Sequence, residues 1–211
     1  MISFDKISRY TDSLIDLKPD ETDEIYAFLS GKKHPVVKKD VARFLAQTVM
    51  IKKPETILEI GTNVGYSSIV MALKMKKGKI YSIDYRADHH KKAKDNFLRY
   101  GVDEKIELLT GYAQDILPGL KMTFDIIFID ADKKGYSDYL DYAAAHINEN
   151  GIILIDNLFW KGSVIEPPDT PDERNISGSL TDLNIKFSKL KGFSAQILSI
   201  GDGLGFAVKE G

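Results

Sequence analysis

Oxygen-bearing side chains come directly after two separate apolar runs of this sequence, where they could share a hard metal ion. Asp130 follows one such run, and Asp156 with Asn157 follows another. Carboxylate and amide oxygens are the ligands that Mg²⁺ and Ca²⁺ prefer. Each acid alone could instead cap a helix or a turn. The repetition of oxygen donors at the ends of two neighbouring strands, with Lys133 close to Asp130, favours a site.

A glycine turn lies within the segment Thr-Ile-Leu-Glu-Ile-Gly-Thr-Asn-Val-Gly-Tyr-Ser-Ser at residues 56–68. Its apolar run ends at Gly61, Gly65 follows four residues later, and an amphipathic segment then begins. This order predicts a strand, a tight turn and a helix whose N-terminus points at a ligand. An NAD-binding turn would normally have the pattern Gly-x-Gly-x-x-Gly, which this segment lacks. Glu59, at the end of an otherwise buried strand, needs a polar partner.

Further polar residues follow the other predicted strands. Asp84 could accept hydrogen bonds from two ribose hydroxyls, or it could cap a helix. Gln114, in Gly-Tyr-Ala-Gln-Asp at 111–115, could bind an adenine edge, or it could be a polar loop residue. His89 and His90 begin a predicted helix beside two lysines, and we expect them on a solvated face.

The elements that position these residues alternate in type from residue 56 onward. Apolar strands and amphipathic helices follow one another, which predicts an α/β fold with a doubly wound, mostly parallel sheet. Ligands of such sheets bind outside the carboxyl ends of the strands, where the polar residues above lie. The strands are predicted at Thr56–Ile60, Lys79–Ile83, Lys105–Thr110, Phe124–Ile129 and Gly151–Ile155, and the helices at Tyr66–Met75, Asp88–Tyr100 and Tyr136–Ile147.

The two ends of the chain differ from this core. Residues 4–50 have the spacing of three helices, ended by Pro19, by Gly31 and near Met50, and we expect them to form a cap within a single 211-residue domain. Residues 161–179 hold three prolines and are predicted to be a long loop before a helix at 180–190. Strands at 194–200 and 205–209, joined by Gly-Asp-Gly, predict an antiparallel hairpin.

The composition is that of an ordinary globular protein. The net charge of −2 argues against bulk electrostatic binding to nucleic acid or to an anionic membrane. Recurring lysine pairs leave a local basic patch for RNA open. The absence of cysteine excludes disulfides and thiolate chemistry. The N-terminal residues lack the apolar core of a signal peptide and no apolar run has membrane-spanning length, so we expect a cytoplasmic protein.

The motifs, taken in order, resemble those of class I S-adenosylmethionine-dependent methyltransferases. More narrowly, they resemble the cation-dependent O-methyltransferases that include the catechol and caffeoyl-CoA enzymes and their small bacterial relatives. The resemblance runs from about Pro35 to the C-terminus. It rests on the glycine turn and on the segments Gly-Tyr-Ala-Gln-Asp-Ile-Leu-Pro (111–118), Phe-Ile-Asp-Ala-Asp-Lys (128–133), Asp-Asn (156–157) and Gly-Asp-Gly-Leu (201–204).

The resemblance implies S-adenosylmethionine and a divalent cation as cofactors, with Mg²⁺ expected before Ca²⁺ or Mn²⁺. It implies catalytic roles for Lys133, as general base, and for Asp130, and it implies a homodimer built partly through the N-terminal helices. The implied metal ligands are Asp130, Asp156 and Asn157. The implied cofactor contacts are Val37, Glu59, Gly61, Thr62, Gly65, Ser67, Asp84, Ala113, Gln114 and Asp132.

Three positions depart from the family pattern. Asn63 stands where many members have an aromatic residue, Gly205 where the catechol enzymes have a glutamate, and Lys161 where the caffeoyl-CoA enzymes have an asparagine. We therefore expect methyl transfer to a hydroxyl of a small aromatic acceptor, catechol-like or hydroxycinnamate-like, without assigning either substrate. The alternatives are a hydroxylated uridine in tRNA and a non-catalytic module that binds S-adenosylmethionine or RNA. Such a module would be expected to lose the metal set or Lys133.

Overall fold

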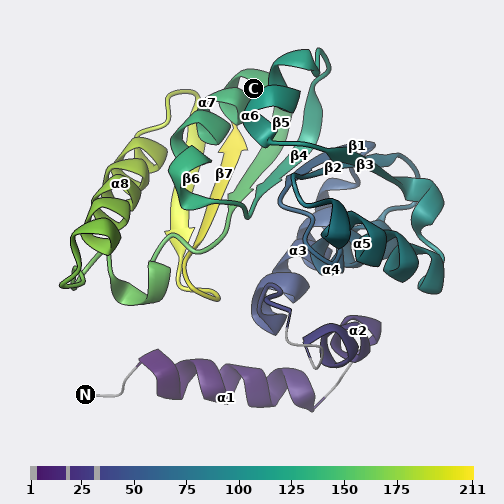
Figure 1. Cartoon of the computed structure of the whole chain (residues 1–211), viewed down its shortest axis with the longest axis horizontal. Coiled ribbons are helices and arrows are strands. Elements are labelled where there is room, and N and C mark those ends of the chain that lie inside the picture. The colour runs from purple at the N-terminus through teal and green to yellow at the C-terminus, as the bar shows by residue number, and fades with distance from the viewer. Residues whose placement is uncertain (1–3, 18–19, 31–33) are drawn as a thin grey trace.

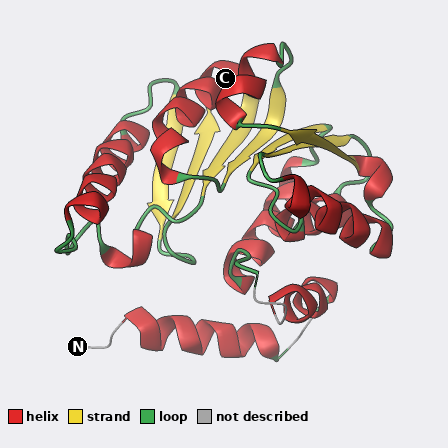
Figure 2. Cartoon of the chain, in the orientation of Figure 1, coloured by secondary structure: helices red, strands yellow, loops and turns green. Residues whose placement is uncertain are grey.

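The computed structural model of the protein describes residues 4–17, 20–30 and 34–211. Pro19 and Gly31, predicted to end the first two helices, lie outside these ranges. The described elements form a central sheet with helices packed on both of its faces (Figures 1 and 2). The α-helices are α1 (Phe4–Asp16), α2 (Glu21–Ser30), α3 (Lys39–Lys52), α4 (Tyr66–Lys74), α5 (Ala87–Arg99), α6 (Ala113–Ile116), α7 (Tyr136–His146) and α8 (Pro171–Ser188).

The sheet has seven strands in the order β3-β2-β1-β4-β5-β7-β6. The first five strands are parallel to one another, and β7 and β6 run antiparallel at one edge. This confirms the predicted mostly parallel sheet with a C-terminal antiparallel hairpin. The strands are β1 (Thr56–Ile60), β2 (Lys79–Asp84), β3 (Ile106–Thr110), β4 (Phe124–Ile129), β5 (Ile147–Ile155), β6 (Phe193–Leu198) and β7 (Leu204–Lys209).

Alternate residues of each strand point to opposite faces, so the sheet has a core on each side. Ile57 of β1 belongs to the cluster that holds α3 and α4, whereas its neighbour Leu58 belongs to the cluster that holds α7 and α8. Strands buried on both faces explain the continuous apolar run of β4. The chain order reverses between β1 and β4, which is where a doubly wound sheet opens a crevice for a ligand.

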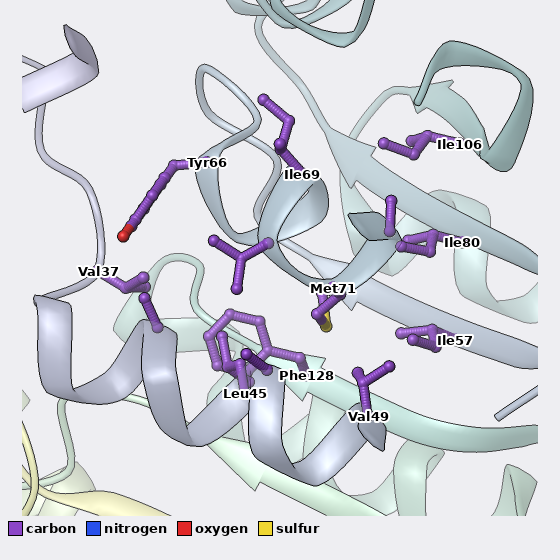
Figure 3. Packing of buried hydrophobic residues seen from close by; sticks show 14 of the residues in the cluster. Val37, Leu45, Val49, Ile57, Tyr66, Ile69, Met71, Ile80, Ile106 and Phe128 are labelled. Atoms are coloured by element: carbon purple, nitrogen blue, oxygen red, sulfur yellow. The ribbon is translucent and has the colours of Figure 1, made fainter. Parts of the chain in front are cut away.

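The hydrophobic core on the side of the sheet that holds α3 and α4 fixes the position of the glycine turn. Leu45 of α3 and Phe128 of β4 belong to one buried cluster, and in Figure 3 Val37 and Tyr66 lie at one end of it. Burying each such side chain stabilises the fold by about 1.5–3 kcal/mol. Because α4 begins at Tyr66, this packing positions the turn between β1 and α4.

Two boundaries differ from the sequence predictions by four residues or more. The strand β5 begins at Ile147 rather than Gly151, because the polar residues in between continue the strand and Asn148 Nδ2 donates to Asp125 Oδ1 at 2.9 Å. The predicted loop at 161–179 is wrong in its second half, where α8 begins at Pro171. Proline is accepted in the first helical turn because its missing N–H has no partner there in any case.

The helix α1 exposes its apolar side chains. Ile7 is 51%, Tyr10 64% and Leu14 46% exposed. Asp16, the last residue of α1, forms an ion pair with Lys39 of α3, with Oδ1 and Nζ 2.6 Å apart. In Figure 1, α1 lies below α3, apart from the sheet. None of the helices in the described ranges has the length and apolarity needed to cross a bilayer.

Candidate active site

A cavity of about 1310 Å³ opens at the carboxyl ends of the parallel strands, where the reversal of strand order predicts it. Residues that follow each of β1 to β5 line it, together with the segment 35–38 and the turn between β6 and β7. The structure brings most of the predicted site residues to this one cavity. The predicted residues that line it are Val37, Gly61, Thr62, Ser67, Asp84, Ala113, Asp130, Asp132, Lys133, Asp156 and Asn157.

Gly61 allows the end of β1 to approach the end of β4. Its φ of 111° disfavours any side chain, and a Cβ there would lie 2.0 Å from the carbonyl oxygen of Asp130. The backbone of Asp130 donates to the carbonyl of Ile60 at 2.9 Å. The glycine turn and the first predicted metal ligand are therefore held against each other.

Gly65 and Glu59 support the turn from behind, and neither lines the cavity. A Cβ on Gly65 would lie 2.4 Å from the Phe97 ring, so this glycine lets α5 pack closely. The Glu59 carboxylate is fully buried and accepts hydrogen bonds from the hydroxyls of Ser67, Ser68 and Ser82. Burial raises the pKa of Glu59 to about 7, while the three serine hydroxyls lower it. The polar partners that Glu59 was predicted to need are present, and its carboxylate lies behind the cavity wall, so the predicted contact of Glu59 with the cofactor stays a prediction.

Asp84 faces the cavity and is also hydrogen-bonded to the backbone near it. It lines the cavity, and its carboxylate also accepts hydrogen bonds from the backbone of Asn63 at 2.8 Å and of Arg86 at 2.9 Å. Asn63 in turn donates through Nδ2 to the carbonyl of Pro35 at 2.5 Å. This chain of contacts ties the glycine turn to the segment 35–38 above it.

The third strand end differs from the prediction. Gln114 is exposed in the short helix α6 and does not line the cavity. Tyr112, two residues earlier, does line it, and its ring stacks on that of Tyr85 with centroids 5.0 Å apart and an angle of 8° between the planes. The two rings form an exposed aromatic wall beside Asp84 that was not predicted. No spacing in the sequence links residues 85 and 112, which meet only because β2 and β3 are adjacent.

The predicted metal set is assembled around Lys133. The Lys133 ammonium donates to Asn157 Oδ1 at 3.0 Å and lies 3.8 Å from Asp130 Oδ1. Asp156 is 2% exposed, and its Oδ1 accepts from the backbone of Asn157 at 2.8 Å. Desolvation raises the pKa of Asp130, and desolvation with the charge of Asp130 raises the pKa of Asp156 to about 7.

Burial raises both pKa values more than the charge of Lys133 lowers them. Burial lowers the pKa of Lys133, although Asp130 and Asp156 oppose this shift. Two carboxylates and an amide oxygen are hard donors that fit a divalent cation. The described residues contain no group of three His, Cys, Asp or Glu side chains placed to hold a metal, so the fit depends on the Asn157 amide.

Three further residues shape this end of the cavity. Tyr136, not predicted, accepts from the Lys133 ammonium and donates to the Asp156 carbonyl at 3.1 Å. Asp202 was predicted as part of a hairpin turn and of the Gly-Asp-Gly-Leu segment, with no role at the site. It lines the cavity, and its charge raises the pKa of both Asp156 and Lys133 against the burial that lowers the latter. Asp132 lines the cavity while accepting hydrogen bonds from the Gly135 backbone and the Tyr139 hydroxyl.

The prediction of solvated histidines is wrong. His89 and His90 are 9% and 5% exposed, and His90 Nδ1 is hydrogen-bonded to Thr110 Oγ1 at 2.7 Å. Burial lowers the pKa of both rings. His89, Ala93 and Phe97 are spaced four residues apart, which places His89 on the buried face of α5. The lysines that follow the two histidines led to the prediction of a solvated face instead.

Comparisons with known proteins identify the family of the chain. A model of the O-methyltransferase family matches residues 23–210. A catechol O-methyltransferase of Niastella koreensis is 31% identical over an alignment of 174 residues that covers 79% of this chain and 79% of the relative. A caffeoyl-CoA O-methyltransferase of Eucalyptus globulus is 30% identical over 82% of this chain and 75% of its own. The crystal structure of a Bacillus cereus O-methyltransferase in complex with SAH has a TM-score of 0.81 and 27% identity, covering 97% of both chains.

The chain therefore belongs to the O-methyltransferase family of class I S-adenosylmethionine-dependent enzymes. This confirms the resemblance carried by the ordered motifs of the sequence. It also confirms the Rossmann-like α/β fold and excludes the NAD-dependent reading of the glycine turn.

Proposed function

We propose that the protein transfers the methyl group of S-adenosylmethionine to a hydroxyl of a small aromatic acceptor with the help of a divalent cation. The observation that carries this proposal is the meeting of the glycine turn with Asp130, Asp156, Asn157 and Lys133 in one cavity. The names of the relatives, which denote methylation of catechol and of caffeoyl-CoA, support an aromatic hydroxyl as acceptor.

The cofactor is proposed to extend between two ends of the cavity. Its nucleoside end lies by Asp84 and Ala113, and its methionine end lies by Gly61, Thr62 and Ser67. Ser67 connects the buried Glu59 to the cavity. It is a lining residue, and its hydroxyl donates a hydrogen bond to the Glu59 carboxylate at 2.5 Å. Glu59 thus fixes the orientation of Ser67.

The chemistry needs an oxygen nucleophile aligned behind the methyl carbon. A cation at Asp130, Asp156 and Asn157 would supply Lewis acidity to an acceptor hydroxyl, whose ordinary phenolic pKa of about 10 makes it a poor nucleophile. Lys133 Nζ is assigned as the acceptor of the hydroxyl proton, because burial lowers its pKa and so brings it closer to the range in which a general base works.

As the oxygen–carbon bond forms, the carbon–sulfur bond of the donor breaks and its electron pair stays on sulfur. The products are a methyl ether, S-adenosylhomocysteine and a proton on Lys133. Alignment of this kind can supply about 7–11 kcal/mol of the barrier reduction. Tyr136 keeps the Lys133 ammonium in place, since its hydroxyl bridges that group and the Asp156 carbonyl.

A panel of acceptors tests the proposal. Radiolabelled S-adenosylmethionine is incubated with the protein, Mg²⁺ and, in turn, a catechol, a hydroxycinnamate and tRNA that lacks its usual modifications. Transfer to the aromatic diols is expected. Transfer to tRNA alone would replace the proposal with the tRNA alternative, and binding of the cofactor without any transfer would indicate a non-catalytic module.

We also propose that the protein is a homodimer in which α1 is covered. Ile7, Tyr10 and Leu14 have the three- and four-residue spacing of one helix face, and all three are about half exposed or more. A second copy would remove this stripe from water. Light scattering is expected to give twice the chain mass, with Leu14→Glu monomeric and the control Ser13→Glu dimeric. A monomeric wild-type protein would contradict this proposal.

A further inference from the structure

Lys161 is a charged residue of the cavity that the reaction described above does not use. It lines the same cavity as the metal set and is exposed. Its ammonium has no hydrogen bond or ion pair with any of the described residues. The other cations that line the cavity have acceptors within the chain: Lys38 donates to the Gly201 carbonyl, Lys133 to Asn157 and Arg86 lies 3.6 Å from Asp84. Lys161 is therefore available to a ligand.

The backbone holds Lys161 in a position that favours a different residue type. Trp160, Lys161 and Gly162 have φ values of 43°, 58° and 85°, which lie in the left-handed region. Glycine or asparagine adopts this conformation at least cost. The backbone nitrogen of Lys161 donates to both carboxylate oxygens of Asp202 at 2.9 Å, and these hydrogen bonds hold Lys161 in its left-handed conformation. A strained lysine held this firmly at a cavity wall points to use of its side chain.

An apolar wall adjoins Lys161. Phe159 and Ile165 both line the cavity, and Ile165 is 78% exposed. The Phe159 ring packs against the turn between β6 and β7, since a Cβ on Gly203 would lie 2.6 Å from it. An aromatic acceptor with its hydroxyl at Asp156 and Asn157 would have this wall beside its ring, and Lys161 is only four residues along the chain from Asn157.

We propose that the acceptor carries a carboxylate, placed away from the reacting hydroxyl, and that Lys161 binds it. This inference rests on the proposed function and narrows it to aromatic diols with an acidic substituent. The cavity is otherwise acidic near the hydroxyl end, where Asp130, Asp156 and Asp202 line it. These acids disfavour an anionic group at the hydroxyl end, whereas the Lys161 ammonium favours one, and this difference would orient the acceptor.

The test compares aromatic diols that carry an anionic, a neutral or a cationic substituent. Turnover of 3,4-dihydroxybenzoate, its methyl ester and 3,4-dihydroxyphenylethylamine is measured with the Mg²⁺-loaded protein. A hydrogen bond between two charged groups corresponds to about 10- to 100-fold in affinity. The acid is therefore expected to exceed the ester by at least tenfold in kcat/KM, mainly through KM. Lys161→Met should remove that ratio, Lys161→Arg should keep most of it, and the control Lys134→Met, an exposed lysine outside the cavity lining, should keep all of it.

The outcomes separate this inference from the proposed function. Equal use of acid and ester by the wild type, or an unchanged ratio in Lys161→Met, overturns the carboxylate assignment while diol methylation stands. A weaker affinity of Lys161→Met for S-adenosylmethionine, measured by calorimetry, would show that the lysine serves the cofactor and would also overturn it. Failure of every diol to accept the methyl group refutes the proposed function and this inference with it.

Discussion

Glu59 provides a test of how the cofactor turn is supported. Its carboxyl is fully buried among three serine hydroxyls, and its pKa is raised from 4.5 to about 7. Because the folded protein holds this proton more tightly than the unfolded chain, the group stabilises the fold most at low pH. That contribution is lost as the pH rises from about 4.5 to 7. The shift corresponds to about 3 kcal/mol between pH 4.5 and pH 8.

Glu59→Gln removes the titration and keeps the shape of the side chain. The amide can still be satisfied, because serine hydroxyls both donate and accept hydrogen bonds. Urea unfolding of wild type and variant is measured from pH 4.5 to 8 in the presence of a chelator. The stability of the variant relative to wild type is expected to increase by about 3 kcal/mol over this range. Parallel curves for the two proteins would refute the buried, proton-binding environment assigned to Glu59.

Two substitutions test the elements that hold the site. Gly61→Ala is expected to abolish binding of S-adenosylmethionine in calorimetry, because its Cβ would lie 2.0 Å from the Asp130 carbonyl oxygen. Unchanged affinity would contradict the close approach of β1 and β4. Leu45→Ala, 1% exposed between α3 and the sheet, is expected to cost about 2–5 kcal/mol of unfolding free energy in urea titrations. A loss below 1 kcal/mol would contradict the packing shown in Figure 3.

Much of the fold could be predicted from local patterns. The alternation of apolar strands with amphipathic helices indicated the parallel sheet, and Gly201-Asp-Gly203 indicated the hairpin. The errors lie where local chemistry conflicts with tertiary pairing. Asn148 has low strand propensity, but its amide bonds Asp125 across the sheet, and Pro171 marks the beginning of α8 rather than a loop.

The convergence of cavity residues could be predicted where they directly follow a strand, because the sheet topology brings the carboxyl ends of the parallel strands together. Asp130, Asp156 and Asn157 were found in this way. Residues that meet only through packing were not, as Tyr85 and Tyr112 show. Glu59 was expected at the cavity, but its buried side chain points to serines that no single motif contains.

The central claim is that Asp130, Asp156 and Asn157 hold a cation on which methyl transfer depends. The most direct measurement is radiolabelled methyl transfer to a catechol by wild type, Asp156→Ala and the exposed control Asp95→Ala, with Mg²⁺ and with excess chelator. We predict that chelation or Asp156→Ala removes most activity while calorimetry still detects binding of S-adenosylmethionine, and that Asp95→Ala resembles wild type. Full activity of the wild type in excess chelator would contradict the claim.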